Sequence, residues 1–455
     1  GELQLHNGSG GTPHSGTFAG GVVLYGTHPL SNASFTGTGN KLFGTHVLSR
    51  ATTSTIAPGA TAVLAGNIEG PGKLLVRGTL DWTGGEMKSF GSTYVAETGR
   101  LNIPTTSGSS NHELGSNFAL VNDGTLAVGA GEGANLGADF HIYNNGTFTW
   151  EAGYYGELAG SSTGLISNSG TFVKTGYDRG VYVPMENDGT IRVDTGMTIH
   201  TRFRSYSRTK SILKEGEYVL KAPLKIINLE TFSRNAARIT LDGPTAVLAD
   251  NAGVNALRGL TRNAGGGRIT LKNGATLSTL AAVRNAGKIT VEAGSTLTTP
   301  GYTQVRGATV VDGSTATLAV GTSPGMSITG GSLRGTGVVQ GNVTNSGGSV
   351  MPGGAAPGQL SVQGSYTQTS LGSLDLDVGG LSSYDSLSVT GTAALGGRLG
   401  LLSSTSYAPV LGDAFTFLTY SSQTGAFASF SGTGLPGGLT YAIQLQPQST
   451  TAVVQ

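Results

Sequence analysis

One turn sequence recurs four times in the first half of the chain: Asn122-Asp123-Gly124-Thr125, Asn144-Asn145-Gly146-Thr147, Asn168-Ser169-Gly170-Thr171 and Asn187-Asp188-Gly189-Thr190. The Asn residues are 22, 24 and 19 positions apart. A short alternating run of apolar and polar residues follows each turn, as in Thr147-Phe148-Thr149-Trp150, which is typical of a half-buried β-strand. A repeat of about 20 to 24 residues is the length of one solenoid coil.

The same signal returns further along the chain at Asn263-Ala264-Gly265 and Asn285-Ala286-Gly287, again 22 residues apart. Asn and Gly suit such corners because both tolerate left-handed backbone angles, and Asn amides can stack in ladders from coil to coil. A hairpin sandwich would place its turns every 8 to 12 residues, about half the observed spacing. The sequence therefore predicts an all-β chain folded as a parallel β-helix, right-handed as parallel crossovers usually are.

Composition limits the function classes. The 455 residues include 76 Gly, 15 Pro and no Cys, and 27 Lys and Arg against 26 Asp and Glu leave a formal charge of +1. This balance favours neither nucleic acid nor an anionic membrane as a partner. No run approaches the roughly 18 apolar residues of a membrane-spanning helix, so we expect a protein that does not span a membrane. If it is exported, we expect its signal to have been removed.

A Gly- and Pro-rich segment, residues 347–359, lacks a clear strand and divides the chain in composition. We expect a β-helix over residues 1–350 and a C-terminal β-rich domain over 351–455. Solenoid ends expose apolar core and strand edges, so this second domain is predicted to cap the β-helix.

The run Pro352-Gly353-Gly354-Ala355-Ala356-Pro357-Gly358-Gln359, followed by Tyr384-Asp385-Ser386-Leu387 and Ala394-Leu395-Gly396-Gly397, resembles the closing region of large bacterial surface proteins. These include autotransporter-passenger-like and adhesin-like β-helix stalks. Gly78-Thr79-Leu80-Asp81-Trp82 and the Asn-Xaa-Gly-Thr coils are similar to the repetitive stalks of the same proteins. The resemblance implies an extracellular or bacterial cell-surface location and says nothing of chemistry.

Candidate catalytic and metal-binding residues are sparse. The densest acidic group is Glu186, Asp188 and Asp194 with Asp178 nearby, which could act as acid and base on a glycosidic bond if their spacing suited one. All seven His residues lie in the first 200 positions without ligand spacing, and surface positions are expected for them. We therefore predict no catalytic residue, no metal site and no cofactor.

Residues 202–225 form a run rich in basic residues, with Phe203 and Tyr206 interleaved. Arg binds carboxylates through two parallel hydrogen bonds, and aromatic faces stack on sugars. The run is therefore a candidate site for a glycan or a neighbouring subunit, or else a solvated irregular coil. The residues chosen for this contact are Arg202, Arg204, Tyr206, Arg208 and Lys210.

The function that fits these features is that of a non-enzymatic extracellular structural or adhesive protein, a bacterial surface stalk, biofilm matrix or fibre subunit. Two alternatives stay open on the same scaffold: a polysaccharide-active enzyme, either a lyase or a glycosidase, and a glycan-binding module. Expected partners are other copies of the chain, a polysaccharide, or a host or cell surface. We hypothesise head-to-tail polymers, since Glu2–His6 and residues 442–455 both read as strands with little charge to protect an edge.

Overall fold

A computed structural model describes residues 3–6, 12–104, 112–115, 117–130, 134–135, 140–154, 156–354, 356–403, 407–432 and 435–455. Within these ranges the chain is nearly all β, and its parallel strands stack as the coils of a β-solenoid, which confirms the predicted fold class. The described ranges hold no α-helix, only the short 3₁₀ helices η1 (Ala256–Gly259) and η2 (Pro436–Gly438). Neither is long and apolar enough to cross a membrane.

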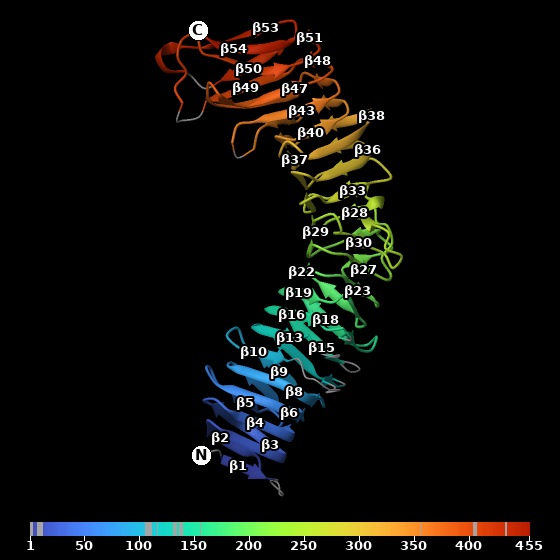
Figure 1. Ribbon diagram of the computed structural model, residues 1–455, viewed down its shortest axis with the longest axis vertical. Helices are drawn as coiled ribbons and strands as arrows, with labels where there is room; N and C mark the ends of the chain where they lie inside the picture. Colours follow the sequence, from blue (N-terminus) through green and yellow to red (C-terminus); the bar gives the residue numbers. More distant parts are fainter. Residues whose placement is uncertain are drawn as a thin grey trace. The chain divides into compact units, whose positions relative to one another are not determined.

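The chain divides into two compact units. Unit 1 comprises Gly1–Ser207, Glu215–Glu230 and Val247–Val254; unit 2 comprises Arg208–Lys214, Thr231–Ala246 and Asn255–Gln455. Each unit is a stack of short strands, labelled in Figure 1.

In unit 1 each coil passes through up to three columns of parallel strands. The first column consists of β1 (Leu3–His6), β3 (Val22–Thr36), β4 (Asn40–Leu48), β6 (Thr61–Glu69), β8 (Thr79–Met87), β10 (Arg100–Ile103), β13 (Thr125–Val128), β16 (Thr147–Ala152), β19 (Thr171–Gly176), β22 (Thr190–Val193) and β26 (Glu217–Leu220). The second, which includes the end of β3, consists of β2 (His14–Ala19), β5 (Thr53–Ile56), β7 (Lys73–Val76), β9 (Ser92–Val95), β12 (Ala119–Asn122), β15 (His141–Asn144), β18 (Leu165–Asn168) and β21 (Met185–Asn187). The third consists of β14 (Ala134–Asn135), β17 (Leu158–Ala159), β20 (Arg179–Val181), β23 (Met197–Ile199), β27 (Leu224–Ile226) and β30 (Leu248–Ala249). Two further short strands complete this unit: β11 (His112–Leu114), which pairs in parallel with the end of β8, and β24 (Tyr206–Ser207).

Unit 2 has the same plan. Its first column consists of β29 (Arg238–Asp242), β32 (Arg268–Lys272), β35 (Lys288–Glu292), β37 (Ala308–Asp312), β39 (Ser332–Gly335), β42 (Ser349–Pro352), β45 (Ser373–Gly380), β49 (Arg398–Ser403) and β52 (Ser429–Gly432). The second consists of β33 (Thr276–Ser278), β36 (Thr296–Gln304), β38 (Thr317–Ile328), β40 (Val338–Gln340), β43 (Gln359–Gln363), β47 (Ser386–Val389) and β50 (Ala414–Thr419). The third, which includes the ends of β36 and β38, consists of β25 (Ile212–Leu213), β28 (Arg234–Asn235), β31 (Arg262–Asn263), β34 (Val283–Asn285), β41 (Val343–Asn345), β44 (Tyr366–Gln368), β48 (Thr392–Leu395) and β51 (Ser422–Gly425).

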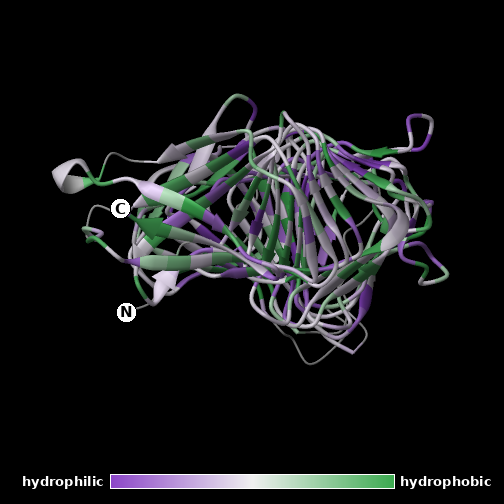
Figure 2. Cartoon of the chain, turned by 90° about the horizontal axis from the view of Figure 1, so that it is seen from above, coloured by the Kyte–Doolittle hydropathy of each residue, from purple (hydrophilic) through white to green (hydrophobic). Residues whose placement is uncertain are grey.

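The core follows from strand alternation. Figure 2 shows hydrophobic and hydrophilic residues mixed along the strands, and in strands such as β7 and β13 buried residues alternate with less buried ones, so that one side of the strand faces the interior of the coil. In unit 1 the pairing places Leu42 on Leu64 and Leu64 on Trp82, and all three side chains are at most 1% exposed. A shift of the strand pairing by one residue would turn these buried side chains towards the solvent. The apolar pattern therefore fixes the register of the strands.

Ladders of amide side chains run inside the corners of both units. In unit 1, Asn122 donates to Asn144 (2.7 Å), Asn144 to Asn168 (2.6 Å), and Asn168 to Asn187 (2.6 Å). These side chains are at most 1% exposed, so the amide bonds form where water does not compete for them. The predicted Asn ladder is therefore confirmed.

The ladder in unit 2 has the same geometry. Asn235 donates to Asn263 (2.9 Å), Asn263 to Asn285 (2.8 Å), and Asn285 to Gln304 (2.9 Å). The last position shows that a longer amide, Gln304, continues the row where the coil no longer carries Asn.

The glycines of the Asn-Xaa-Gly turns have a different role from the one expected. None of Gly124, Gly146, Gly170 and Gly189 has a positive φ, so the predicted left-handed angle is wrong for them. A Cβ at Gly170 would lie 2.1 Å from the carbonyl oxygen of Gly146, and one at Gly189 would lie 2.1 Å from that of Gly170. Glycine is required because successive corners pack backbone against backbone.

Parallel pairing continues through the segment expected to separate two domains. Ser349 pairs with Ser373 across that segment, Ser373 with Arg398, and Arg398 with Ser429. The predicted boundary at residue 350 does not coincide with a break in the stack, and both sides of it lie in unit 2.

The pairing changes later, beyond the last parallel rung. There, β54 (Ser449–Val454) pairs antiparallel with β50 and with β53 (Tyr441–Leu445). Within the parallel stack, the short strand β46 (Ser383–Tyr384) forms an antiparallel hairpin with β45. An antiparallel sheet therefore covers β50.

Candidate functional surfaces

The five residues chosen from the sequence do not belong to one unit. Arg202, Arg204 and Tyr206 lie in unit 1, and Arg208 and Lys210 lie in unit 2. The four cations are exposed, and the guanidinium of Arg204 lies 3.9 Å from the carboxylate of Glu186. The five residues are therefore described separately, three with unit 1 and two with unit 2.

One aromatic side chain of the same run is not available to a ligand. Phe203 is 4% exposed and packs edge-on against Tyr218, with ring centroids 6.1 Å apart. Its role is in the core of unit 1.

One member of the predicted acidic group of unit 1, Asp194, is engaged in ion pairs. Asp194 lies 2.9 Å from Arg192 and 3.3 Å from Lys221. Burial alone would raise the pKa of Asp194, but the hydrogen bonds from these two cations hold it below its usual range. A carboxylate held ionised between two cations is poorly suited to donate a proton.

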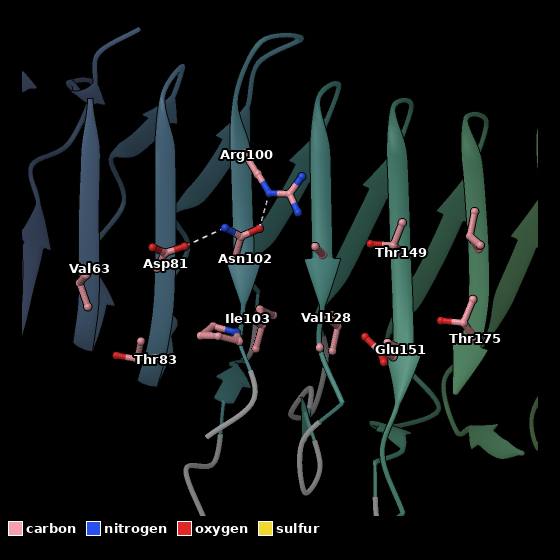
Figure 3. A pocket seen from close by; sticks show the side chains of 14 residues that line it. Val63, Asp81, Thr83, Arg100, Asn102, Ile103, Val128, Thr149, Glu151 and Thr175 are labelled. Atoms are coloured by element: carbon pink, nitrogen blue, oxygen red, sulfur yellow. Dashed lines mark hydrogen bonds between the residues drawn. The ribbon is translucent and has the colours of Figure 1, made fainter. Parts of the chain in front are cut away.

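A groove crosses the outer face of the first column of unit 1 (Figure 3). It has a volume of about 670 Å³ and spans successive strands from β6 to β19. Apolar side chains lie along it together with polar ones: Val63, Asp81, Thr83, Arg100, Asn102, Ile103, Pro104, Ala127, Val128, Gly129, Thr149, Glu151, Val173 and Thr175. In Figure 3, Arg100 donates to Asn102 (2.6 Å), which donates to Asp81 (2.7 Å).

The two carboxylates of the groove are too far apart for a glycosidase pair. The register places Asp81 opposite Asn102, Asn102 opposite Ala127, and Ala127 opposite Thr149, two residues before Glu151. Three rungs correspond to about 14 Å along the stack. Acid and base carboxylates of glycosidases lie about 5 to 9.5 Å apart.

Exposed aromatic rings lie just beyond one end of these strands. Tyr154 is 60% exposed and Tyr177 is 56% exposed, and their rings meet edge-on with centroids 5.7 Å apart. The guanidinium of Arg179 lies over both rings, 5.3 Å and 5.9 Å from their centroids. Tyr154 follows Glu151 by three residues and Tyr177 follows Thr175 by two, so the rings continue from strands that line the groove.

A buried lysine supports this aromatic pair. The amine of Lys174 donates to the carbonyl oxygens of Thr175 (2.8 Å) and Tyr177, and lies 4.8 Å from the Trp150 ring centroid. Burial lowers the pKa of Lys174 to about 8. Since its amine is engaged by backbone carbonyls, Lys174 positions the corner that carries Tyr177.

Three histidines are buried, contrary to the surface positions expected for them: His28, His46 and His112 are 1%, 0% and 3% exposed. A hydrogen bond joins Nδ1 of His28 to Nε2 of His14 (3.0 Å). The ring of His28 also stacks on that of His46, with centroids 6.0 Å apart. Burial, with His28 adding to it, lowers the pKa of His46 to about 3. Among the described residues no group of three His, Asp or Glu side chains is arranged to hold a metal ion.

Sequence reasoning missed a cluster of cations in unit 2, for which we use the name basic corner: Arg234, Arg238, Arg262, Arg268, Arg284 and Lys288. The signal is a repeated motif, Arg-Asn-Ala followed by one to three small residues and another cation, at 234–238, 262–268 and 284–288. The Asn of each motif belongs to the amide ladder, so both flanking cations recur on every coil.

The chain was also compared with known proteins: no protein-family model matches it, and no curated protein is significantly similar in sequence.

Proposed function

We propose that this protein is a non-enzymatic extracellular structural or adhesive protein, a stalk, matrix or fibre subunit of a bacterial surface. The observation that carries the proposal is the buried amide ladder, which joins four successive coils in unit 1 and four in unit 2. Each added coil repeats the same side-chain bond and the same backbone contact. Such repetition suits a stiff element that holds its surface at a distance from a cell.

The resemblance of the chain to bacterial β-helix stalks supports the extracellular assignment. The low charge of the chain, 12% of residues, is compatible with a role in which most of the surface is scaffold. Stacking of copies is part of the proposal, because β52 pairs with β49 on one edge and its four residues are exposed.

The proposal is tested on the purified 455-residue chain. Electron microscopy and sedimentation are expected to show rods or polymers, and incubation with a panel of neutral and uronate polysaccharides is expected to release no reducing ends and no unsaturated products. Turnover of any of these polysaccharides would overturn the non-enzymatic role. Compact monomers in the images would overturn the structural one.

A glycan-binding module is the second candidate, and the groove with its Tyr154 and Tyr177 platform favours it. Asp81 and Glu151 offset Arg100 and Arg179 in charge, so a neutral polysaccharide is the matching ligand. Aromatic faces and amide groups are the usual contacts for sugar rings and hydroxyls. Loss of binding in a Tyr154→Ala/Tyr177→Ala variant, with wild-type binding in the Tyr143→Ala control, would support this candidate.

A further inference from the structure

The basic corner consists of two rows of cations that follow the stacking direction of unit 2. Strand pairing places Arg234 opposite Arg262 and Arg262 opposite Arg284, one cation per coil. A second row follows the corner: Arg238 lies opposite Arg268, and Arg268 opposite Lys288. Neighbouring parallel strands lie about 4.8 Å apart, so each row presents positive charges at that interval.

These charges are not compensated within the described protein. All six side chains belong to exposed residues, and none makes an ion pair or a side-chain hydrogen bond with another described residue. The nearest acidic positions on the same strands are Asp242, which lies 3.3 Å from Lys272, and Glu292, four residues beyond Lys288. Like charges on adjacent strands destabilise a sheet, and this spacing is shorter than the Debye length of about 8 Å at physiological salt.

The basic corner extends to the coils on either side. Arg306 is exposed at the next corner, two residues after the ladder residue Gln304. On the other side, Ser211 accepts the backbone hydrogen bond of Arg234 (3.0 Å), so Arg208 and Lys210 lie on the preceding coil of the same unit. Two of the cations predicted from the sequence to bind a glycan thus lie on a coil that adjoins the basic corner.

We infer that the basic corner binds a linear acidic polysaccharide, with its carboxylate or sulfate groups between the two rows. Five of the six cations are Arg, which binds such groups through two parallel hydrogen bonds. The residues between the rows are Asn, Ala and Gly, so no large side chain blocks the approach of a polymer. A regular row of charges fits a polymer whose own charges repeat along its length.

Neighbouring residues favour a polysaccharide over a nucleic acid. Thr240, Thr270 and Thr290 form a third row beside the second row of cations, and their hydroxyls can bond sugar hydroxyls. The outward positions of β28, β29, β31, β32, β34 and β35 carry no aromatic side chain, although binding of single-stranded nucleic acid relies on aromatic stacking.

The inference names the partner of the proposed adhesive function, and its test measures binding alone. The imaging and turnover experiments test the proposed function itself. The inference can therefore fail while the proposed function holds, and the proposed function can fail while the inference holds. The probes are polygalacturonate, heparin, neutral dextran and a single-stranded oligonucleotide matched to heparin in charge, each titrated calorimetrically against the full chain in 50 mM and 300 mM salt.

Two triple variants remove one row each: Arg234→Gln/Arg262→Gln/Arg284→Gln and Arg238→Gln/Arg268→Gln/Lys288→Gln. The control, Arg50→Gln/Arg77→Gln/Arg192→Gln, removes three exposed cations of unit 1 and changes the net charge equally. We expect each row variant to lose about tenfold or more in affinity for an acidic polysaccharide, and the control to lose little. Raised salt should weaken wild-type binding, because cations that contact a polyanion displace its counterions.

Folding is checked by the melting temperature without ligand, which is expected to stay the same or rise in the row variants because repulsion is removed. If a triple variant does not fold, Arg262→Gln in the middle rung provides the same comparison. Absence of binding to both acidic polysaccharides, equal losses in the control, equal binding of dextran, or tighter binding of the oligonucleotide would each overturn the inference.

Discussion

The corners of the two units share an interior and differ outside. Both bury an amide ladder, from Asn122 to Asn187 in unit 1 and from Asn235 to Gln304 in unit 2. The strand after the corner begins with Thr125, Thr147, Thr171 and Thr190 in unit 1, whereas in unit 2 it begins with Arg238, Arg268 and Lys288. The comparison teaches that the ladder builds the coil and that the residues flanking it determine which ligand chemistry the surface offers.

The largest expected effect is at the glycine corner of unit 1. In Gly170→Val the Cβ would lie 2.1 Å from the Gly146 carbonyl oxygen, and backbone cannot move aside as a side chain can. We expect a loss of about 3 kcal/mol or more in the free energy of unfolding, measured by denaturant titration. Gly266→Val in unit 2 is the matched control, because Gly266 also has no positive φ and its Cβ would come no closer than 3.9 Å to the nearest atom, the carbonyl oxygen of Ala236. Equal losses in the two variants would contradict the close-packing explanation.

Removal of one ladder amide in each unit tests whether the two interiors are equivalent. Asn168→Val and Asn263→Val each delete a buried amide and remove one side-chain hydrogen bond from each ladder neighbour, which are Asn144 and Asn187 in unit 1 and Asn235 and Asn285 in unit 2. We expect a similar loss of about 1 to 3 kcal/mol in both. Hydrogen exchange resolved by peptide should show faster opening in the substituted unit only. A clear loss in one unit and none in the other would break the equivalence.

The two units are expected to respond to acid in opposite directions. His46 stays neutral when folded, with a pKa lowered to about 3, but protonates near 6.5 when unfolded. Its contribution to stability is therefore complete above pH 6.5 and decreases as pH falls towards 3, by about 2 kcal/mol at pH 5. Burial raises the pKa of Asp385 in unit 2 to about 6. The destabilisation that its buried charge causes therefore decreases as pH falls from 6 towards 4 and the carboxylate takes up a proton.

Exchange rates of unit 1 and unit 2 peptides at pH 7 and pH 5, corrected for the intrinsic pH dependence, measure this contrast. His46→Leu should remove the acid sensitivity of unit 1, and Asp385→Asn should remove the opposite trend in unit 2. Unchanged pH profiles in both variants would show that these two groups do not control the response.

The smallest expected effect comes from giving unit 1 the surface of unit 2. In Thr147→Arg/Thr171→Arg/Thr190→Arg, three cations occupy adjacent rungs, since Thr147 pairs with Thr171 and Thr171 with Thr190. We expect a stability loss of about 0.5 kcal/mol per substitution or less, reversed by salt. A gain in polygalacturonate affinity would show that one row of cations is sufficient. No change in affinity would show that both rows are needed.

The fold class could be predicted from the sequence because the coil is a local repeat. Asn at 19 to 24 residue intervals, each followed by an alternating strand, encodes the corner and the strand together, and the structure has both. The close packing of glycine could not be predicted, since a carbonyl oxygen that approaches Gly170 belongs to Gly146, on another coil.

The composition of the surfaces, such as the basic corner, could also be known only from the tertiary structure. Coils differ in length, so the ladder partners lie 28, 22 and 19 residues apart in unit 2, and no constant period aligns Arg234 with Arg262 and Arg284. The burial of His28 and His46 likewise follows from which strands stack, as does the division of the 202–225 run between two units. The sequence by itself determined that coils form and where they turn, because turn chemistry and strand alternation act between near neighbours. Only the stacked structure decided which distant residues share a row, because register is set by the fit of whole coils against each other.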